Sequence, residues 1–332
     1  AQGFTVMETA LEDIGSARTI IVNSGGYQRA LNSYLGRVNY SFDDRYLVTA
    51  SYRADGPSVF GKNNKWGYFP SAAVAWRASE ENFIKDLNIF SDLKIRASWG
   101  IVGNQAISPY QSLAAISSGA NYPWNGTDQV DYGFQISRAV NPNLKWESTT
   151  QKNIGLDLGF FGNRLLATAD FYIKNTHDLL LYRTLPASAG LPSIIDNVGS
   201  TENKGLELSI SGDPLVGLVK WNTGFNISWY RNKVVDLGTT TKLGFQSASG
   251  NYGVSGLMYL IPGEAFGQMY GYSTEGIWKE SERAEAFKYG QLPGMIHYTD
   301  LNKDGTIDLL DQTVIGSALP DFIYGWSNRF TY

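Results

Sequence analysis

The chain lacks cysteine altogether, so disulfide bonds and thiolate chemistry are excluded. Histidine is almost absent: His177 and His297 are the two present, far apart in the sequence, and no local motif makes them a zinc or catalytic pair. No apolar run approaches the roughly 18 residues that a membrane-spanning helix needs. The formal net charge is -4 and there is no basic patch, which argues against nucleic acid as a partner.

The motifs of common enzymes are lacking as well. Serines such as Ser98 do not lie in the Gly-x-Ser-x-Gly setting of a hydrolase nucleophile. The pairs Glu80/Glu81 and Glu202/Glu207 could imitate the two carboxylates of a glycosidase, but charged residues of turns or of a polar lumen explain them more simply. We therefore expect a protein that is not an enzyme.

What the chain does contain is a repeated alternation of apolar and polar residues. Side chains on a β-strand point to opposite faces with period two, so each alternating segment has one apolar and one polar face. After the turn at 162–163, the apolar positions are Leu165, Ala167, Ala169, Phe171 and Ile173. Thr168, Asp170 and Tyr172 lie between them. Segments of about ten residues with this pattern indicate an antiparallel transmembrane β-barrel whose apolar faces contact lipid.

Short and long connections alternate along the chain. The short ones are predicted at 43–44, 162–163 and 213–218. The long ones are predicted at 101–145, 183–202 and 238–320. Outer-membrane barrels have short periplasmic turns and long extracellular loops, so we predict this orientation for about nine or ten strands.

Several longer phrases add a family resemblance to this pattern. The most specific ones are 66–71 (WGYFPS), 93–100 (LKIRASWG) with Gly103-Asn104-Gln105, 141–147 (NPNLKWE), 203–207 (NKGLE) and 300–308 (DLNKDGTID). Taken together and in this order, they resemble the SusC/RagA family of TonB-dependent outer-membrane transporters, over essentially the whole chain.

The resemblance implies a barrel of about 22 strands with an N-terminal plug. It also implies energisation through TonB, a SusD-like surface lipoprotein that caps the barrel, and uptake of oligosaccharides or peptides across the Gram-negative outer membrane. The chain opens on Ala1-Gln2-Gly3-Phe4 without a signal peptide. We therefore expect residues 1–332 to be an internal part of the barrel that lacks the plug, the TonB box and the final strands.

One local motif has the spacing of a calcium-binding loop. With Asp300 as position 1, oxygen ligands fall at positions 1, 3, 5, 9 and 12, the carbonyl of position 7 is added, and glycine stands at position 6. The predicted ligands are Asp300, Asn302, Asp304, Thr306, Asp308 and Asp311. Asp311 stands where an EF-hand has glutamate, and no flanking helix pair is apparent, so a solvated acidic turn held by its own hydrogen bonds is the alternative. We expect a structural Ca²⁺ ion.

Aromatic residues make up 14% of the chain, and several lie in the long loops. Aromatic rings can stack on sugar rings, so Trp124, Tyr132, Tyr270 and Trp278 are the candidate substrate contacts. Loops of this size also fold on aromatic cores or contact partner proteins. Both interpretations remain open for each of these residues.

Two other functions compete with a nutrient importer. A soluble β-sandwich that binds glycans would also be rich in aromatic residues and strands, and a glycoside hydrolase would use paired carboxylates. A sandwich gives no reason for connections of alternating length, and a hydrolase would need convergent acids that the sequence does not display. The importer is therefore the leading hypothesis.

Overall fold

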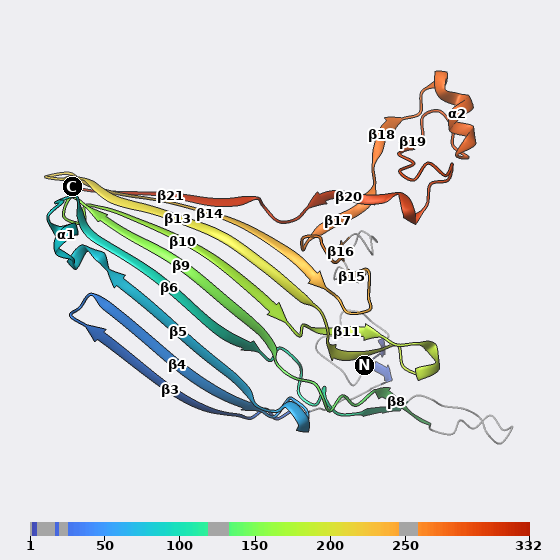
Figure 1. The fold of residues 1–332 in the computed structure, drawn as a ribbon. Helices are drawn as coiled ribbons and strands as arrows, with labels where there is room; N and C mark the ends of the chain where they lie inside the picture. The colour runs from blue at the N-terminus through green and yellow to red at the C-terminus, as the bar shows by residue number, and fades with distance from the viewer. Residues whose placement is uncertain (1, 5–16, 20–25, 119–132, 246–257) are drawn as a thin grey trace.

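The computed structural model describes all residues except 1, 5–16, 20–25, 119–132 and 246–257. Nine long strands form one antiparallel sheet in the order β21-β14-β13-β10-β9-β6-β5-β4-β3, so each strand lies beside its nearest long neighbours in the sequence (Figure 1). Their bounds are β3 Leu31–Phe42, β4 Tyr46–Pro57, β5 Gly67–Arg77, β6 Phe90–Asn104, β9 Glu147–Phe160, β10 Leu165–His177, β13 Ser200–Val216, β14 Lys220–Asp236 and β21 Phe322–Thr331.

The alternation read from the sequence becomes two chemically different faces of this sheet. Phe171 lies in a register row that crosses all nine strands and is apolar throughout. The row consists of Tyr40, Val48, Val74, Ala97, Ile154, Phe171, Leu206, Trp229 and Phe322. The neighbouring row places Arg96, Asp170 and Glu207 on the opposite face. We call these the apolar face and the polar face.

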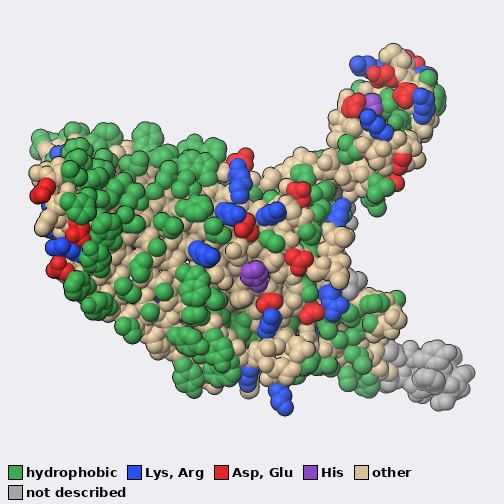
Figure 2. Space-filling view, in the orientation of Figure 1, with side chains coloured by type: hydrophobic (Ala, Val, Ile, Leu, Met, Phe, Trp, Pro, Cys, Tyr) green, Lys and Arg blue, Asp and Glu red, His purple; other side chains and the backbone are tan. Residues whose placement is uncertain are grey.

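The apolar face is not covered by another layer of the described protein. Ile154 is 62% exposed and Phe171 is 46% exposed, and Figure 2 shows apolar side chains spread over much of this side of the strands. A sandwich buries such a face between two sheets. Large exposed apolar surfaces of this kind mark contact with a membrane or a partner.

The connections lie alternately at the two ends of the sheet, and the three longest lie at the same end, although 78–89 at the opposite end is longer than 58–66. One end carries the connections 43–45, 78–89, 161–164 and 217–219. The other end carries 58–66, 105–146, 178–199 and 237–321. Figure 1 shows the long connections gathered at one end, beyond the points where β6, β10 and β14 finish.

Several predicted boundaries were wrong by a few residues. The turn predicted at 213–218 is shorter, because β13 continues to Val216 through a register shift between Gly212 and Leu215. Pro214 suggested a turn in the sequence, yet a bulge accommodates a residue that cannot donate a ladder hydrogen bond. Strand β6 likewise extends to Asn104 and β13 starts at Ser200, so both adjoining loops are shorter than expected.

The long connections also contain secondary structure of their own. They hold a four-stranded sheet, β15-β16-β17-β20, and three two-stranded sheets, and a fourth two-stranded sheet, β1-β2, precedes β3. The additional strands are β1 Gln2–Phe4, β2 Ala17–Thr19, β7 Ala115–Ser118, β8 Phe134–Arg138, β11 Leu180–Thr184, β12 Ser193–Asn197, β15 Leu243–Phe245, β16 Met258–Leu260, β17 Gln268–Tyr272, β18 Thr274–Ile277, β19 Ile296–Tyr298 and β20 Gln312–Ser317. The helices are η3 Lys62–Asn64, η4 Ala78–Glu80, α1 Asn82–Lys85, η5 Ala187–Ala189, η6 Glu280–Glu282, α2 Arg283–Lys288 and η7 Leu309–Asp311. Among the described residues, every helix is too short to cross a membrane.

The buried cores lie beneath these loops rather than within the sheet. One consists of Val59, Phe60, Ile107, Leu144, Trp146 and Ile195, which come from three different connections. A second consists of Val234, Leu237 and Leu260. The loops are therefore packed against one another and against the ends of the strands.

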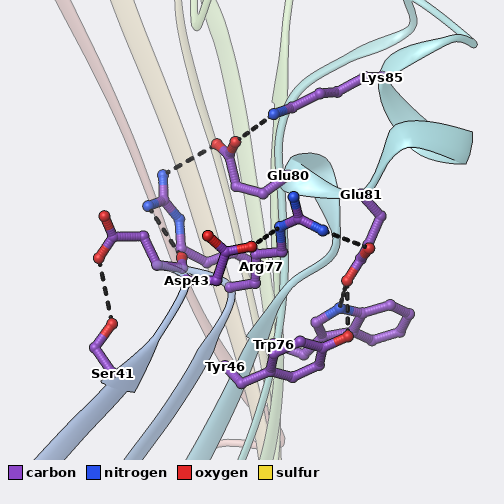
Figure 3. A network of polar contacts seen from close by, with 10 residues as sticks. Ser41, Asp43, Tyr46, Trp76, Arg77, Glu80, Glu81 and Lys85 are labelled. Carbon is purple, nitrogen blue, oxygen red and sulfur yellow. Dashed lines mark hydrogen bonds and ion pairs between the residues drawn. The ribbon is translucent and has the colours of Figure 1, made fainter.

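At the opposite end, a polar network joins two of the short connections (Figure 3). Glu81 accepts hydrogen bonds from the Tyr46 hydroxyl at 2.8 Å and from Trp76 Nε1 at 3.3 Å, and it pairs with Arg45 at 3.2 Å. The hydrogen bond from Tyr46, with that from Trp76, lowers the pKa of Glu81. Glu80 pairs with Lys85 at 2.7 Å. These two glutamates are thus structural residues of a turn rather than a glycosidase pair.

Candidate functional site

The centre of the polar face carries a cluster of paired charges. Arg96 donates to both oxygens of Asp157, each at 2.8 Å, and to Asp170 at 3.0 Å. Lys94 pairs with Asp157 at 2.9 Å, and Asn153 donates to Asp170 at 2.9 Å. The side chains of Arg96, Asp157 and Asp170 are 32%, 17% and 24% exposed. The charged groups of the cluster are therefore in contact with water but partly shielded from it.

Strand register explains why these charges meet. Lys94 lies opposite Asp157, while Gly155 of β9 lies between Arg96 of β6 and Asp170 of β10. Gly155 leaves room for the ion pair, because a Cβ there would lie 2.5 Å from an oxygen of Asp170 and 2.7 Å from the Arg96 guanidinium carbon. The sequence placed Asp170 on the polar face, but it could not reveal Arg96 as a partner that Asp170 shares with Asp157.

One pocket, of about 570 Å³, lies on the apolar face near the short connections. A second pocket, of about 560 Å³, opens on the polar face near the long connections. Its polar lining includes Arg53, Asp55, Asn104 and Gln105, and Phe69 and Trp146 supply aromatic surface. We call this second pocket the polar-face pocket. It combines ionic, amide and aromatic groups, the set that small polar ligands with some apolar surface require.

Two polar atoms at the polar-face pocket have unused hydrogen-bonding capacity. Gln105 Oε1 and Trp146 Nε1 are buried and have no hydrogen-bond partner among the residues that the structure describes. Buried polar groups are normally paired, so such atoms call for an explanation such as a water or a ligand. Arg53, by contrast, is held by Asp55 at 2.7 Å. The sequence reasoning assigned no role to Gln105 and Trp146, although both lie in phrases that carried the family resemblance.

The aromatic ring of Trp146 is fixed by its neighbours. It meets Phe69 edge-on at 5.1 Å between ring centroids and Phe60 at 5.2 Å. Gly103 makes this packing possible, because a Cβ there would collide with Phe69 and approach Trp146 to 2.8 Å. The indole is therefore held in place at the wall of the pocket.

The calcium-like motif folds into a tight turn in which backbone N–H groups engage the acidic side chains. Asp300 accepts from the amides of Lys303 at 2.6 Å and Gly305 at 2.8 Å. Gly305 has φ +85°, a conformation that side-chain-bearing residues rarely adopt. Asp311 is fully buried and accepts from the amides of Leu301 at 2.8 Å and Asp308 at 2.9 Å.

The other predicted ligands belong to the same hydrogen-bonded turn. Asp304 accepts from Thr306 and Asn302, and the hydrogen bond from the Thr306 hydroxyl is the main cause of its lowered pKa. Asp308 accepts from Leu310 and begins η7. Within the described part of the chain, no three His, Asp or Glu side chains converge closely enough to hold a metal. The Ca²⁺ ion thus stays a prediction.

The structure separates the predicted aromatic contacts. Tyr270 lies on β17, edge-on to Tyr259 at 5.9 Å and 5.0 Å from Lys242 Nζ. Trp278 is 3% exposed and stacks on His297 with ring centroids 3.5 Å apart. For Trp278 the structure supports the alternative raised from the sequence, an aromatic core of the loop. Trp124 and Tyr132 lie outside the described residues.

A sheet of long antiparallel strands with one apolar and one polar face, whose longest connections lie at one end, is typical of outer-membrane β-barrel proteins. Comparison with known proteins narrows this class. The family model "TonB dependent receptor-like, beta-barrel" matches residues 9–306. The chain belongs to this family of TonB-dependent receptor barrels.

Individual relatives agree with the family. TonB-dependent receptor P3 of Formosa agariphila is 39% identical over 337 residues, covering 100% of this chain and 33% of that protein. TonB-dependent receptor SusC of Bacteroides thetaiotaomicron is 34% identical over 311 residues, covering 92% and 30%. The RagAB peptide importer in its open-open state matches with a TM-score of 0.76 at 26% identity, covering 98% and 34%. The chain thus spans about a third of the length of the relatives it matches.

Proposed function

We propose that the protein to which this chain belongs imports oligosaccharides or peptides across the Gram-negative outer membrane. The observation that carries the proposal is the polar-face pocket, because it places unpaired polar atoms and a fixed indole beside the long connections. Similarity to SusC and to the RagAB peptide importer supports import as the activity. TonB would supply the energy, and a SusD-like lipoprotein would cap the long connections on the cell surface.

A gene deletion tests this proposal in the parent organism. The deletion strain should lose growth on one class of oligosaccharide or peptide as sole carbon source, and the full-length gene should restore it. Asn104→Leu should lower uptake of that labelled cargo, because it adds an apolar side chain at the polar-face pocket. Asn226→Leu, on β14 and outside the pocket, is the matched control. Unchanged growth of the deletion strain on every tested nutrient would contradict import.

Detergent dependence separates a membrane barrel from the soluble glycan-binding sandwich that the sequence left as an alternative. The discriminating feature is the apolar face, since a sandwich needs that face buried and the described strands leave it exposed. The full-length protein should therefore remain in the membrane fraction and dissolve only with detergent. Recovery of a monomeric folded protein without detergent would favour the sandwich.

We further propose that the turn from Asp300 to Asp311 binds Ca²⁺ as a structural ion. The spacing of its oxygen ligands and the positive φ of Gly305 support this proposal. Extracellular calcium modules bind at about 10⁻⁴–10⁻³ M, so millimolar Ca²⁺ should protect residues 273–311 from protease. Asp304→Ala should remove the protection, while Asp86→Ala at the other end of the sheet should not. Protection that is independent of Ca²⁺ would leave the motif a hydrogen-bonded turn.

A further inference from the structure

Basic residues on the apolar face occupy one restricted zone. Within the nine described strands, the lysines and arginines of this face are Lys152, Lys204, Arg231 and Lys233. All four lie toward the long connections. In Figure 2 the apolar surface gives way in that direction to a zone where charged side chains gather. The cations thus mark one border of the apolar surface.

Strand register aligns three of these cations. Lys152, Lys204 and Arg231 share a row with Ile173, and the adjacent row toward the short connections consists of Ile154, Phe171, Leu206 and Trp229. Because neighbouring strands lie about 4.8 Å apart, the Lys152 and Lys204 backbones are about 10 Å apart. Along the strands toward the long connections, an apolar row is therefore followed by a row that contains three cations. This is the order in which acyl chains and phosphates follow one another in a lipid leaflet.

The other border of the apolar face has a different chemistry. Its residues near the short connections are aromatic, and they include Phe42, Tyr46, Trp76, Phe160, Trp221 and Phe330. Aromatic side chains suit either membrane interface, whereas a group of cations suits an interface that carries negative charge. Cations at this border come from the connections: Arg45 pairs with the Glu81 that Tyr46 and Trp76 contact, and Arg164 lines an apolar pocket. Within the described strands themselves, the cations of the apolar face are confined to the border near the long connections.

A shallow groove lies beside Lys152 on the apolar face and crosses β5, β6 and β9. It has a volume of about 360 Å³, and its lining includes Ala72, Ala97, Trp99, Ile154 and Lys152. The small alanines form its floor between larger neighbours on β5, β6 and β9. The pairs that partly neutralise the other cations, Lys204 with Glu202 and Arg231 with Asp321, are exposed. Lys152 itself has no ion pair among the described residues and is one of the residues that line the groove.

We propose that this surface is a binding site for an anionic bilayer lipid. One acyl chain occupies the groove, and the lipid phosphate contacts Lys152, with Lys204 and Arg231 beside it. Long basic side chains lay their methylene stems on apolar surface and extend the charge to the head-group level, which suits this position. The inference rests on the proposed membrane location, and it adds that the barrel selects phosphate-bearing lipids at the end near the long connections.

Lipid selectivity can be measured on the full-length protein reconstituted in phosphatidylcholine membranes. Spin-labelled phosphatidylglycerol and spin-labelled phosphatidylcholine are the probes, and the fraction immobilised at the protein is read by electron spin resonance. Loss of one cation near a charged head group corresponds to about a fivefold change in affinity at that site. Lys152→Gln should therefore reduce the preference for phosphatidylglycerol. Ala97→Leu, which fills the groove, should reduce immobilisation of both probes at this site.

Matched variants make the result specific. Lys174→Gln removes a cation of neighbouring β10 that lies on the polar face, so the lipid preference should stay unchanged. Ala169→Leu adds the same bulk to the apolar face outside the groove. Equal lipid preference in wild type and Lys152→Gln, with immobilised lipid present, would overturn this inference and leave the membrane location intact. Absence of any immobilised lipid would contradict the proposed function itself.

Discussion

Replacing Arg96 by methionine should weaken the sheet more than any other single removal of charge on the polar face. The substitution keeps much of the side-chain volume but deletes three charge-assisted hydrogen bonds, two to Asp157 and one to Asp170. It also leaves two partly shielded carboxylates of like charge on adjacent strands. Both effects lower the stability of the folded state.

The magnitude follows from the contacts that remain. A hydrogen bond to a charged group contributes about 1.5–3 kcal/mol. Solvent screening reduces this here, because the side chains are 17–32% exposed, and Lys94 and Asn153 still hold the two aspartates. We therefore expect the free energy of unfolding to fall by about 2–4 kcal/mol. In a double-mutant cycle with Asp170→Asn, a coupling energy of about 1–2 kcal/mol should appear.

Urea unfolding of the full-length protein in lipid vesicles, followed by tryptophan fluorescence, measures this change. Arg37→Met is the control, since Arg37 lies on the polar face of β3 and makes no ion pair with the described residues. Such a surface change stays within about 0.5 kcal/mol. If Arg96→Met were no more destabilising than Arg37→Met, the cluster would not stabilise the sheet.

Three further outcomes test orientation and the turn network. Cysteine at Phe171 should react with a lipid-soluble reagent and cysteine at Asp170 with a water-soluble one, and the reverse pattern would show that the faces are assigned wrongly. Protease added to whole cells should cut the long connections and spare Gly162, so cleavage at Gly162 would reverse the topology. Because the pKa of Glu81 is lowered in the folded state, its contribution is present at neutral pH and lost as the pH falls through that pKa. Protection factors of the amides at 78–89, corrected for the intrinsic exchange rate at each pH, should therefore fall on acidification, and Glu81→Gln should remove this fall.

Much of the sheet could be predicted from the sequence because period-two alternation is a local property. Alternate residues from Leu165 to Ile173 fall on one face as predicted, and β10 begins where the pattern begins but continues beyond it to His177. The end of β13 was harder to predict. The sequence predicted a turn from 213 onward, but a bulge at Pro214 allows the strand to continue. Turn residues also occur in bulges, so their presence alone does not end a strand.

The candidate site could be predicted far less well, because it depends on register between strands. Asp157 and Arg96 are distant in the sequence, and a shift of one residue would place them on opposite faces. Trp146 and Gln105 lie at the two ends of the connection 105–146, and they line the same pocket only once that connection has folded. For Trp278 the difficulty is that the role of a single residue is ambiguous. A loop tryptophan that binds sugar cannot be distinguished in the sequence from one that packs in a small core, as Trp278 does against His297.

The pairing of Tyr272 with Gln312 on strands β17 and β20 has a consequence for how this protein can change in evolution. The residues between them, which include α2 and the Asp300 turn, leave and re-enter the four-stranded sheet at adjacent points (Figure 1). A segment with neighbouring ends can lengthen, shorten or be exchanged without shifting the strands that carry it. Relatives could therefore acquire different surface modules at this position while keeping the same barrel.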